Sequence, residues 1–347
     1  MNSENEKGGA FREKGLSAMR ICIVNNSVIP VSQYGGVQRV IWYLGKELAR
    51  MGHRVTFLVR EGSSCPFARV VHIDPAKPMG AQIPADTDVI SFNNTLPREK
   101  PAIPYVVTLH GNVKKEGTEL DRNTVFVSKD HAQRYGAEAF VHNGLDWDDY
   151  GVPELNAPRS YAHFLGKAAW RVKNLKGAVK VVTALPGERL YVLGGRRLNF
   201  KMGFRFTPSL RVKFFGMVGG GEKLALLQGS KALVFPVRWH EPFGLALTES
   251  LYFGCPVLGT PYGSLPEIVG PEVGFLSAKS DELSAALSDV GRFSRKLCHE
   301  YARDTFNSAI MARGYLRKYE AVINGEALNI AQPVAGKQPE NKFLPWD

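Results

Sequence analysis

The sequence predicts an α/β protein in which two Rossmann-like parallel-sheet domains face each other across a cleft. Three observations lead to this fold class. Each half of the chain alternates apolar strand segments with helical segments, as parallel sheets wrapped by helices require. A stretch rich in Asn, Asp and Pro, residues 141–160, separates the halves as a linker would. The length of 347 residues also exceeds the roughly 250–300 residues that one hydrophobic core usually spans.

The first half begins with an apolar strand at 19–28, a glycine-containing loop and an amphipathic helix. Apolar residues recur in this helix at helical spacing: Val37, Val40, Ile41, Leu44 and Leu48. Gly52 ends it. Further strands are predicted at 54–59, 87–92, 104–111 and 123–128.

The second half repeats the pattern. Strands are predicted at 160–167, 189–195, 211–218, 231–237 and 255–260, with helices at 175–185, 222–230 and 244–254. A long helix over 281–323, broken near Gly291, and a polar tail follow. The predicted division is a disordered leader (1–18), an N-terminal Rossmann-like domain (19–155), a C-terminal Rossmann-like domain (156–310), and a helix and tail that cross back to the first domain (311–347).

Composition excludes several classes of protein. No apolar run is long enough to span a membrane, and residues 1–18 lack the pattern of a signal peptide. The four scattered cysteines have neither metal nor redox spacing, which favours free thiols in a reducing cytoplasm and argues against structural zinc. The net charge of +11 favours an anionic partner, with simple solubility as the alternative. The cations are dispersed and no nucleic-acid module accompanies them, so we expect no nucleic-acid partner.

The most informative stretch is WHEPFGLALTES, residues 239–250, which carries Glu241 and Glu249 within mostly apolar surroundings. Glu241 follows a predicted strand, and a helix begins near Gly244. This places Glu241 at the carboxyl edge of a parallel sheet, where ligands bind in open α/β folds. The unpaired amides of a first helical turn favour an anion there. By itself, the glutamate pair also fits two solvated acids at a helix start.

The wider segment HEPFGLALTESLYFGCPVLGTPYGSLPEIV resembles the motif of the retaining glycosyltransferases of family 4, also called glycosyl transferases group 1, which have the GT-B fold. The resemblance extends over about residues 20–320. The chain matches the pattern at Glu241, Phe243, Gly244, Glu249, Gly254, Pro256, Val257, Gly263, Pro266 and Glu267. It departs at Ser264, where a second glycine is frequent, and at Ser250, Tyr252 and Phe253, where smaller residues are commoner.

The resemblance implies a nucleotide-diphosphate sugar in the cleft between the domains. Glu249 would bind the ribose hydroxyls, and Glu241 would lie against the donor sugar. The backbone amides of Phe243, Gly244 and Leu245 would hold sugar or phosphate oxygens.

Two cations usually hold the diphosphate in this family, and GKAAWRVKN offers Lys167 and Lys173 for them. Lys167 stands where arginine is usual, so bidentate phosphate recognition is in question there. Arg171 and Lys176 are the alternative phosphate ligands. Each lysine taken alone also fits a solvated surface residue.

Other positions have roles that the resemblance suggests. Gly35 and Gly36 would form a loop near the donor phosphate or the acceptor, because glycine allows close backbone approach. His110, at the end of a strand, would lie beside the donor sugar, although a structural histidine fits as well. Met217 and Val218 would contact the base. Matching positions at the end of the first domain, which a structural role also explains, are Ser128, Asn143 and Asp146.

The sequence therefore predicts a retaining glycosyltransferase that moves a sugar from a nucleotide-diphosphate sugar to an acceptor hydroxyl, with His110, Glu241 and Lys173 as catalytic residues. Surface polysaccharide, lipopolysaccharide or glycolipid synthesis would suit it. No cofactor and no metal ion are expected. Alternatives are an epimerase or phosphorylase of the same fold, or a binding protein that has lost catalysis. A dinucleotide-dependent oxidoreductase fits poorly, because no strand precedes Gly-x-Gly-x-x-Gly.

The expected partners are the nucleotide-sugar donor and a glycan or lipid-linked acceptor. The basic loop at 112–117 could contact an anionic membrane, although a solvated loop explains it equally well. The expected location is the cytoplasm, with peripheral contact at the inner membrane face as the most that the sequence supports.

Overall fold

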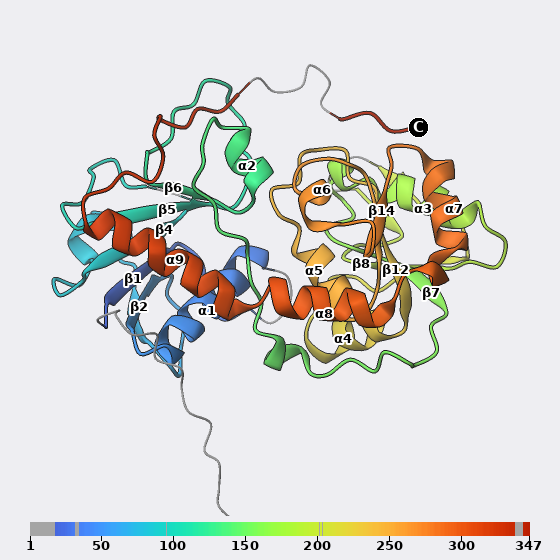
Figure 1. The fold of residues 1–347 in the computed structure, drawn as a ribbon, viewed down its shortest axis with the longest axis horizontal. Coiled ribbons are helices and arrows are strands. Elements are labelled where there is room, and N and C mark those ends of the chain that lie inside the picture. The colour runs from blue at the N-terminus through green and yellow to red at the C-terminus, as the bar shows by residue number, and fades with distance from the viewer. Residues whose placement is uncertain (1–17, 32–34, 95, 201, 203, 337–342) are drawn as a thin grey trace, which may run out of the picture.

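The computed structural model describes residues 18–31, 35–94, 96–200, 202, 204–336 and 343–347. It contains two α/β domains side by side (Figure 1). Each domain has a six-stranded sheet in which all neighbouring strands run parallel. The predicted fold class is therefore confirmed. The predicted leader lies outside the described residues except for residue 18.

The N-terminal sheet has the strand order β3-β2-β1-β4-β5-β6. Its strands are short apolar runs whose central members are almost wholly buried, as expected of a parallel sheet. The strands are β1 (Arg20–Asn25), β2 (Arg54–Val59), β3 (Arg69–His72), β4 (Val89–Asn93), β5 (Tyr105–Leu109) and β6 (Thr124–Phe126).

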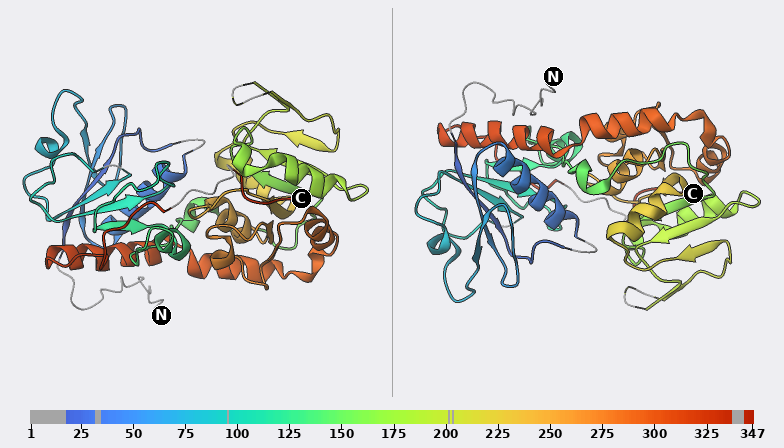
Figure 2. Two further views of the ribbon diagram at one scale, coloured as in Figure 1. Left: turned by 90° about the horizontal axis from the view of Figure 1, so that it is seen from above. Right: turned by 90° about the horizontal axis from the view of Figure 1, so that it is seen from below.

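The C-terminal sheet has the order β11-β8-β7-β12-β13-β14, which repeats the topology of the first. A two-stranded antiparallel hairpin, which the sequence did not reveal, projects beside it (Figure 2). The sheet strands are β7 (Tyr161–Leu165), β8 (Leu190–Leu193), β11 (Val212–Phe214), β12 (Ser230–Phe235), β13 (Val257–Gly259) and β14 (Gly274–Leu276), and the hairpin strands are β9 (Leu198–Asn199) and β10 (Arg205–Phe206).

In both sheets the strand order reverses beside the first strand, between β1 and β4 and between β7 and β12. Such switch points are where open α/β sheets bind ligands. The helices begin or end near these edges: α1 (Gly36–Arg50), α2 (Lys129–Gln133), α3 (Leu175–Thr183), α4 (Gly220–Gln228), α5 (Leu245–Tyr252) and α6 (Leu265–Ile268). Short 3-10 turns connect others: η1 (Met79–Gln82), η2 (Trp147–Tyr150) and η3 (Arg171–Lys173).

The prediction of one long helix over 281–323, broken only near Gly291, is wrong. The segment forms α7 (Ser280–Ser288), the 3-10 turn η4 (Val290–Arg292), α8 (Arg295–Thr305) and α9 (Ser308–Ile323). The predicted break near Gly291 is present as η4. A second break follows Phe306, where the Asn307 side chain accepts a hydrogen bond from the Ile310 amide and starts a new helix.

Helices α8 and α9 run end to end along one side of the molecule (Figure 1). Helix α8 packs on α5 of the C-terminal domain, whereas α9 packs on α1 and β5 of the N-terminal domain. The contact with β5 includes a hydrogen bond of 3.1 Å from Thr108 Oγ1 to the Tyr315 hydroxyl. The chain thus links its two domains between α8 and α9 as well as at residues 141–160.

Candidate functional site

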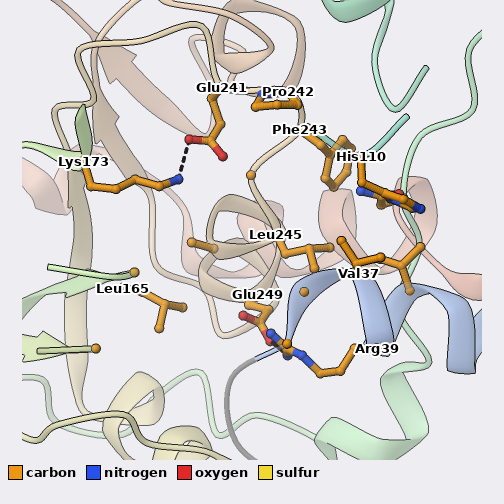
Figure 3. Close-up of a pocket in the computed structure, with 18 of the residues that line it drawn as sticks. Val37, Arg39, His110, Leu165, Lys173, Glu241, Pro242, Phe243, Leu245 and Glu249 are labelled. Atoms are coloured by element: carbon orange, nitrogen blue, oxygen red, sulfur yellow. Dashed lines mark hydrogen bonds and ion pairs between the residues drawn. The ribbon is translucent and has the colours of Figure 1, made fainter. Parts of the chain in front are cut away.

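The candidate site is a cavity of about 490 Å³ between the two domains. Its walls come from residues that follow β1, β4 and β5 on one side and β7, β8 and β12 on the other, so the two switch points face each other across it. Figure 3 shows charged side chains from α1, from the η3 turn and from α5 converging on this space. The arrangement puts one ligand within reach of both domains.

The start of α5 forms part of the wall. Phe243, Gly244 and Leu245 all line the cavity, and no side chain caps the first turn of the helix. Gly244 has a φ of 86°, in the left-handed region that favours glycine, and an added Cβ would lie 3.1 Å from Leu247 Cδ1. Uncapped amides and the helix dipole make this turn suitable for an anionic ligand.

Glu241 and Lys173 form a buried ion pair in the cavity (Figure 3). The Lys173 ammonium lies 2.5 Å from Glu241 Oε2, and the Trp239 indole donates to the same oxygen at 2.7 Å. The ammonium also lies 5.0 Å from the Phe235 ring centroid and 5.1 Å from that of Trp239. Because the ammonium is largely buried, this cation acts more strongly on a nearby charge than a surface lysine would.

Glu249, which is 2% exposed, lies at the centre of a second polar cluster. Its Oε1 accepts hydrogen bonds from the Tyr150 hydroxyl and the Lys223 ammonium, each at 2.5 Å, and from the Arg39 guanidinium. Arg39 belongs to α1 of the N-terminal domain, so its ion pair with Glu249 joins the two domains across the cavity.

These contacts set the charge state of Glu249. Burial alone would raise the pKa of the carboxyl, but Arg39, Lys223 and Tyr150 lower it to about 2. The same burial lowers the pKa of Lys223, although the Glu249 charge opposes this effect. Burial and the neighbouring carboxylate raise the pKa of Tyr150. The cluster therefore presents an ionised carboxylate with a neutral phenol at neutral pH.

His110 follows β5 and lines the same cavity. Its Nε2 lies 2.8 Å from Asn93 Oδ1, and its backbone amide donates to Asn94 Oδ1 at 3.1 Å. Burial lowers the pKa of His110 to about 4. The imidazole is therefore neutral at physiological pH and can donate or accept one hydrogen bond without carrying charge.

Most of the residues predicted for the site lie together. The cavity is lined by Gly35, Gly36, His110, Lys173, Met217, Val218, Glu241, Phe243, Gly244, Leu245 and Glu249. An added Cβ on Gly36 would lie 3.4 Å from Leu245 Cδ1 of the opposite domain, so a glycine keeps this part of the cleft open.

The predicted cluster of phosphate-binding cations is not formed as expected. Lys167 lies outside the residues that line the cavity, with its ammonium 5.3 Å from the Trp170 ring centroid. Arg171 and Lys176 line a different cavity. In the η3 turn Arg171 is exposed and Lys173 is buried, and α3 then begins with Lys176 on its solvent face. Of the four predicted phosphate ligands, only Lys173 reaches the site in this structure.

The sequence did not identify Arg39, Tyr150 and Lys223 as residues of the site. Arg39 lies one turn into the helix that follows the Gly35–Gly36 loop, and Lys223 follows the glycine-rich turn at 216–221. A cation within one helical turn of a glycine loop was the available signal. It did not identify Glu249 as the partner, because Arg39 and Glu249 are 210 positions apart.

The structure also explains where the motif departs from its usual pattern. The Ser264 hydroxyl donates to the Phe243 carbonyl at 2.7 Å and so braces the turn before α5. The Ser250 hydroxyl contacts the buried His163 ring at 2.8 Å. The Tyr252 ring stacks on Trp147 of the linker, with centroids 4.1 Å apart. Each of these larger side chains therefore makes a contact that a smaller residue could not make.

Several other motif residues hold the domains together. Ser128, which caps α2, donates through its hydroxyl to the Pro242 carbonyl at 2.6 Å. Glu267 accepts hydrogen bonds from the amides of Lys129 and Asp130 at the start of α2, at 2.9 and 3.0 Å. It also lies 2.5 Å from the His142 ring. The N-terminal domain thus contacts both ends of the motif.

The predicted residues Asn143 and Asp146 differ from each other in their surroundings. Asn143 lines the cavity, whereas Asp146 caps η2 and pairs with Lys46 at 2.7 Å. Asn112, in the predicted basic loop, donates to the His240 carbonyl of the other domain at 2.7 Å. Cys22, Cys65, Cys255 and Cys298 are free thiols, as predicted.

Within the described ranges, no group of three or more His, Cys, Asp or Glu side chains has the arrangement of a metal site. None of the helices described is long and apolar enough to cross a membrane.

Residues 154–304 match the family of glycosyl transferases group 1. Among curated proteins, O-antigen chain mannosyltransferase B of Escherichia coli is 27% identical over 165 residues, which cover 45% of this chain and 40% of that protein. An uncharacterized 41.2 kDa protein in the cps region of Klebsiella pneumoniae is 24% identical over 117 residues, 32% of each chain. The chain thus matches between a third and two fifths of the length of these relatives.

Solved structures resemble the whole fold. AviGT4, a glycosyltransferase involved in avilamycin A biosynthesis, superposes with a TM-score of 0.73 at 21% identity, over 88% of this chain and 98% of that one. HepE of Anabaena, solved with UDP-glucose, gives a TM-score of 0.62 at 14% identity, over 87% of this chain and all of that one. The resemblance to group 1 glycosyl transferases that the motif indicated is confirmed, and the GT-B architecture with it.

Proposed function

We infer, from the match of residues 154–304 to the group 1 glycosyl transferases and from the chemistry of the cavity between the domains, that the chain is a glycosyltransferase. We propose that it is a retaining enzyme of family 4. It would move a sugar from a nucleotide-diphosphate sugar to an acceptor hydroxyl. The observation that carries the proposal is the meeting of two buried carboxylates, a buried lysine and an uncapped helix start in one cavity.

Lys173 and the start of α5 would neutralise the leaving diphosphate. Negative charge grows on this group as the bond to the sugar breaks. One cation at about 4 Å contributes roughly 4 kcal/mol at an effective dielectric of 20. The Lys173 ammonium is held in place by Glu241 and two aromatic rings, so little reorganisation is needed when the charge appears. The proposed mechanism requires no metal ion.

Glu249 would bind the ribose hydroxyls of the donor. The hydrogen bonds from Arg39, Tyr150 and Lys223 all end on Oε1, which would leave Oε2 for the ribose hydroxyls. Because the carboxyl is ionised down to about pH 2, its hydrogen bonds to hydroxyl groups are charge-assisted. Such bonds contribute roughly 1.5–3 kcal/mol each.

Glu241 and His110 would position the donor sugar. Glu241 receives its two hydrogen bonds on Oε2, which orients the carboxylate toward the cavity. The neutral His110 ring can hydrogen-bond a sugar hydroxyl without attracting the acceptor's proton. We propose that the acceptor attacks on the same face from which the diphosphate leaves, and that the leaving phosphate takes the acceptor's proton. Glu241 then orients the sugar and does not form a bond to it.

The biological role proposed is the synthesis of a surface polysaccharide, lipopolysaccharide or glycolipid in the cytoplasm. One curated relative is an O-antigen mannosyltransferase, and another lies in a cps region. The direct experiment is turnover of a panel of UDP-, GDP-, ADP- and CMP-sugars with mass-spectrometric detection of the product and its anomeric configuration. An inverted product would contradict the retaining mechanism. A trapped glycosyl–Glu241 adduct would contradict the proposed attack on the leaving-group face without a bond to Glu241. Absence of any turnover would favour a binding protein.

A further inference from the structure

The hairpin of β9 and β10 presents its apolar side chains to solvent. Leu198 pairs with Phe206 and Asn199 with Arg205 across the two strands. Along each strand the apolar residues are exposed and the polar residue between them is half-buried, which is the reverse of the usual pattern. Phe200 is 68% exposed and Phe204 is 73% exposed, with their ring centroids 5.8 Å apart. The hairpin thus carries an uncovered aromatic face.

A cavity lined by cations lies beside this face, and Phe204 and Phe206 of the face themselves contribute to its lining. It has a volume of about 610 Å³, and its lining includes Arg171, Lys176, Arg205 and Arg238. None of the described residues that line it is acidic, and none of these four cations forms an ion pair within the part of the chain that the structure describes. Phe343 lies between two of them, with the guanidinium carbons of Arg171 and Arg238 at 5.1 and 5.4 Å from its ring centroid.

The mutual placement of aromatic and cationic groups distinguishes between possible occupants. A second copy of the chain would bring these unpaired cations against one another, at an electrostatic cost that increases at low salt. An anionic bilayer offers what both groups lack: an apolar boundary for the phenylalanines and phosphates for the cations. The net charge of +11 acts in the same direction.

We propose that this hairpin surface, formed by Leu198, Phe200, Phe204 and Phe206 with the cations Arg171, Lys176, Arg205 and Arg238 beside them, docks the protein on an anionic phospholipid bilayer. The inference goes beyond glycosyl transfer and does not depend on it. It places membrane contact on the C-terminal domain and not on the 112–117 loop.

Docking would bring the bilayer close to the cleft. The Arg205 guanidinium donates hydrogen bonds to the carbonyl groups of Ala168 and Ala169, the latter at 3.2 Å. These residues belong to the loop after β7, which also contributes Gly166 and Trp170 to the cleft wall. A membrane-bound hairpin therefore holds the C-terminal-domain side of the cleft near the lipid surface.

The experiment is vesicle co-sedimentation of the full chain, using vesicles of phosphatidylcholine and phosphatidylglycerol in equal parts and vesicles of phosphatidylcholine alone. The aromatic variant is F200S/F204S. Its matched control is V152S/I330S, which removes two apolar side chains that are 96% and 80% exposed elsewhere on the surface. We expect the wild type and the control to bind the anionic vesicles alike. F200S/F204S should bind at least about tenfold more weakly, with an unchanged unfolding temperature because its side chains are exposed.

A second pair of variants tests the cations. K176E reverses a charge that lines the cavity, and K180E reverses an exposed charge on the same helix that does not. K176E should weaken vesicle binding more than K180E does, and added salt should remove the difference. The proposal is overturned if the wild type ignores anionic vesicles, or if F200S/F204S binds them as tightly as its control. A wild-type dimer that F200S/F204S dissociates, with vesicle binding unchanged, would assign the face to self-association and equally overturn it.

Discussion

Glu249→Gln should destabilise the fold substantially. The substitution keeps the shape of the side chain but removes the charge that Arg39, Lys223 and Tyr150 contact. The pKa of Glu249 falls from an ordinary 4.5 to about 2 in the folded protein, and one pKa unit corresponds to about 1.4 kcal/mol, which gives about 3 kcal/mol. Loss of one partner of a buried ion pair costs about 3–5 kcal/mol in other proteins, so the two estimates agree.

The assay is urea denaturation followed by tryptophan fluorescence. We expect E249Q to lose about 3 kcal/mol at pH 7, and the double variant E249Q/K223M to recover about 1–2 kcal/mol, because it removes a cation that would otherwise be buried without a counter-charge. Glu61→Gln, at an exposed position, is the control and should change stability by less than about 0.5 kcal/mol. If E249Q were as stable as E61Q, the reasoning about this cluster would be refuted.

The pH dependence gives the same cluster a second test. The folded pKa of Glu249 is lowered, so its contribution is fully present above pH 4.5 and is lost as the pH falls toward about 2. The stability difference between wild type and E249Q should therefore narrow below pH 4.5. If the stability difference between wild type and E249Q widened below pH 4.5, the lowered pKa of Glu249 would be contradicted.

Three further predictions concern single positions. Gly263→Ala should lower the free energy of unfolding by about 3 kcal/mol or more, because its Cβ would lie 2.3 Å from the Glu241 amide nitrogen at a φ of 66°. In the same urea denaturation assay, Gly62→Ala should cost only about 1 kcal/mol, because Gly62 has a φ of 89° but open space around it. His110→Gln should reduce the loss of stability between pH 6.5 and about 4. Because burial lowers the pKa of His110, the contribution of the neutral ring to stability is complete above pH 6.5 and becomes smaller as acid protonates the histidine of the unfolded chain. An unchanged pH profile of stability would argue against burial of the neutral ring. Ser264→Gly, which restores the family's frequent residue, should still destabilise by about 1 kcal/mol through the lost bond to the Phe243 carbonyl, and equal stability in urea would contradict this.

Local pattern was sufficient for most of the fold. The strands around Val107 and Leu233 are apolar runs between turn residues, and the α1 positions such as Leu44 recur at helical spacing, so each element is encoded within a few residues. The break after Phe306 was missed because Asn307 was not recognised as a helix cap. The hairpin was missed because its apolar residues alternate as in a buried strand, although they face solvent.

The residues of the site likewise divide into those that the local sequence predicts and those that only the folded chain brings together. Glu241 and the α5 start were predictable because strand, turn and helix are contiguous in sequence. The partners of Glu249 were not, since α1 and α4 are brought to it only by the arrangement of the two domains. Lys167 was predicted because it stands where the family usually has arginine, and Lys176 as a nearby alternative. Burial in the η3 turn instead places Lys173 in the site.

The most direct test of the account is the affinity of the cleft for a donor. Isothermal titration calorimetry would compare wild type, Lys173→Met and Lys180→Met, using UDP-glucose, GDP-mannose and the corresponding free nucleotides as probes. Lys180 is exposed on α3 and supplies the matched loss of charge away from the cavity. We predict that the nucleotide sugar which wild type binds most tightly binds Lys173→Met at least about tenfold more weakly and binds Lys180→Met unchanged. Equal affinity of wild type and Lys173→Met would contradict the proposal that this cavity holds the donor's diphosphate.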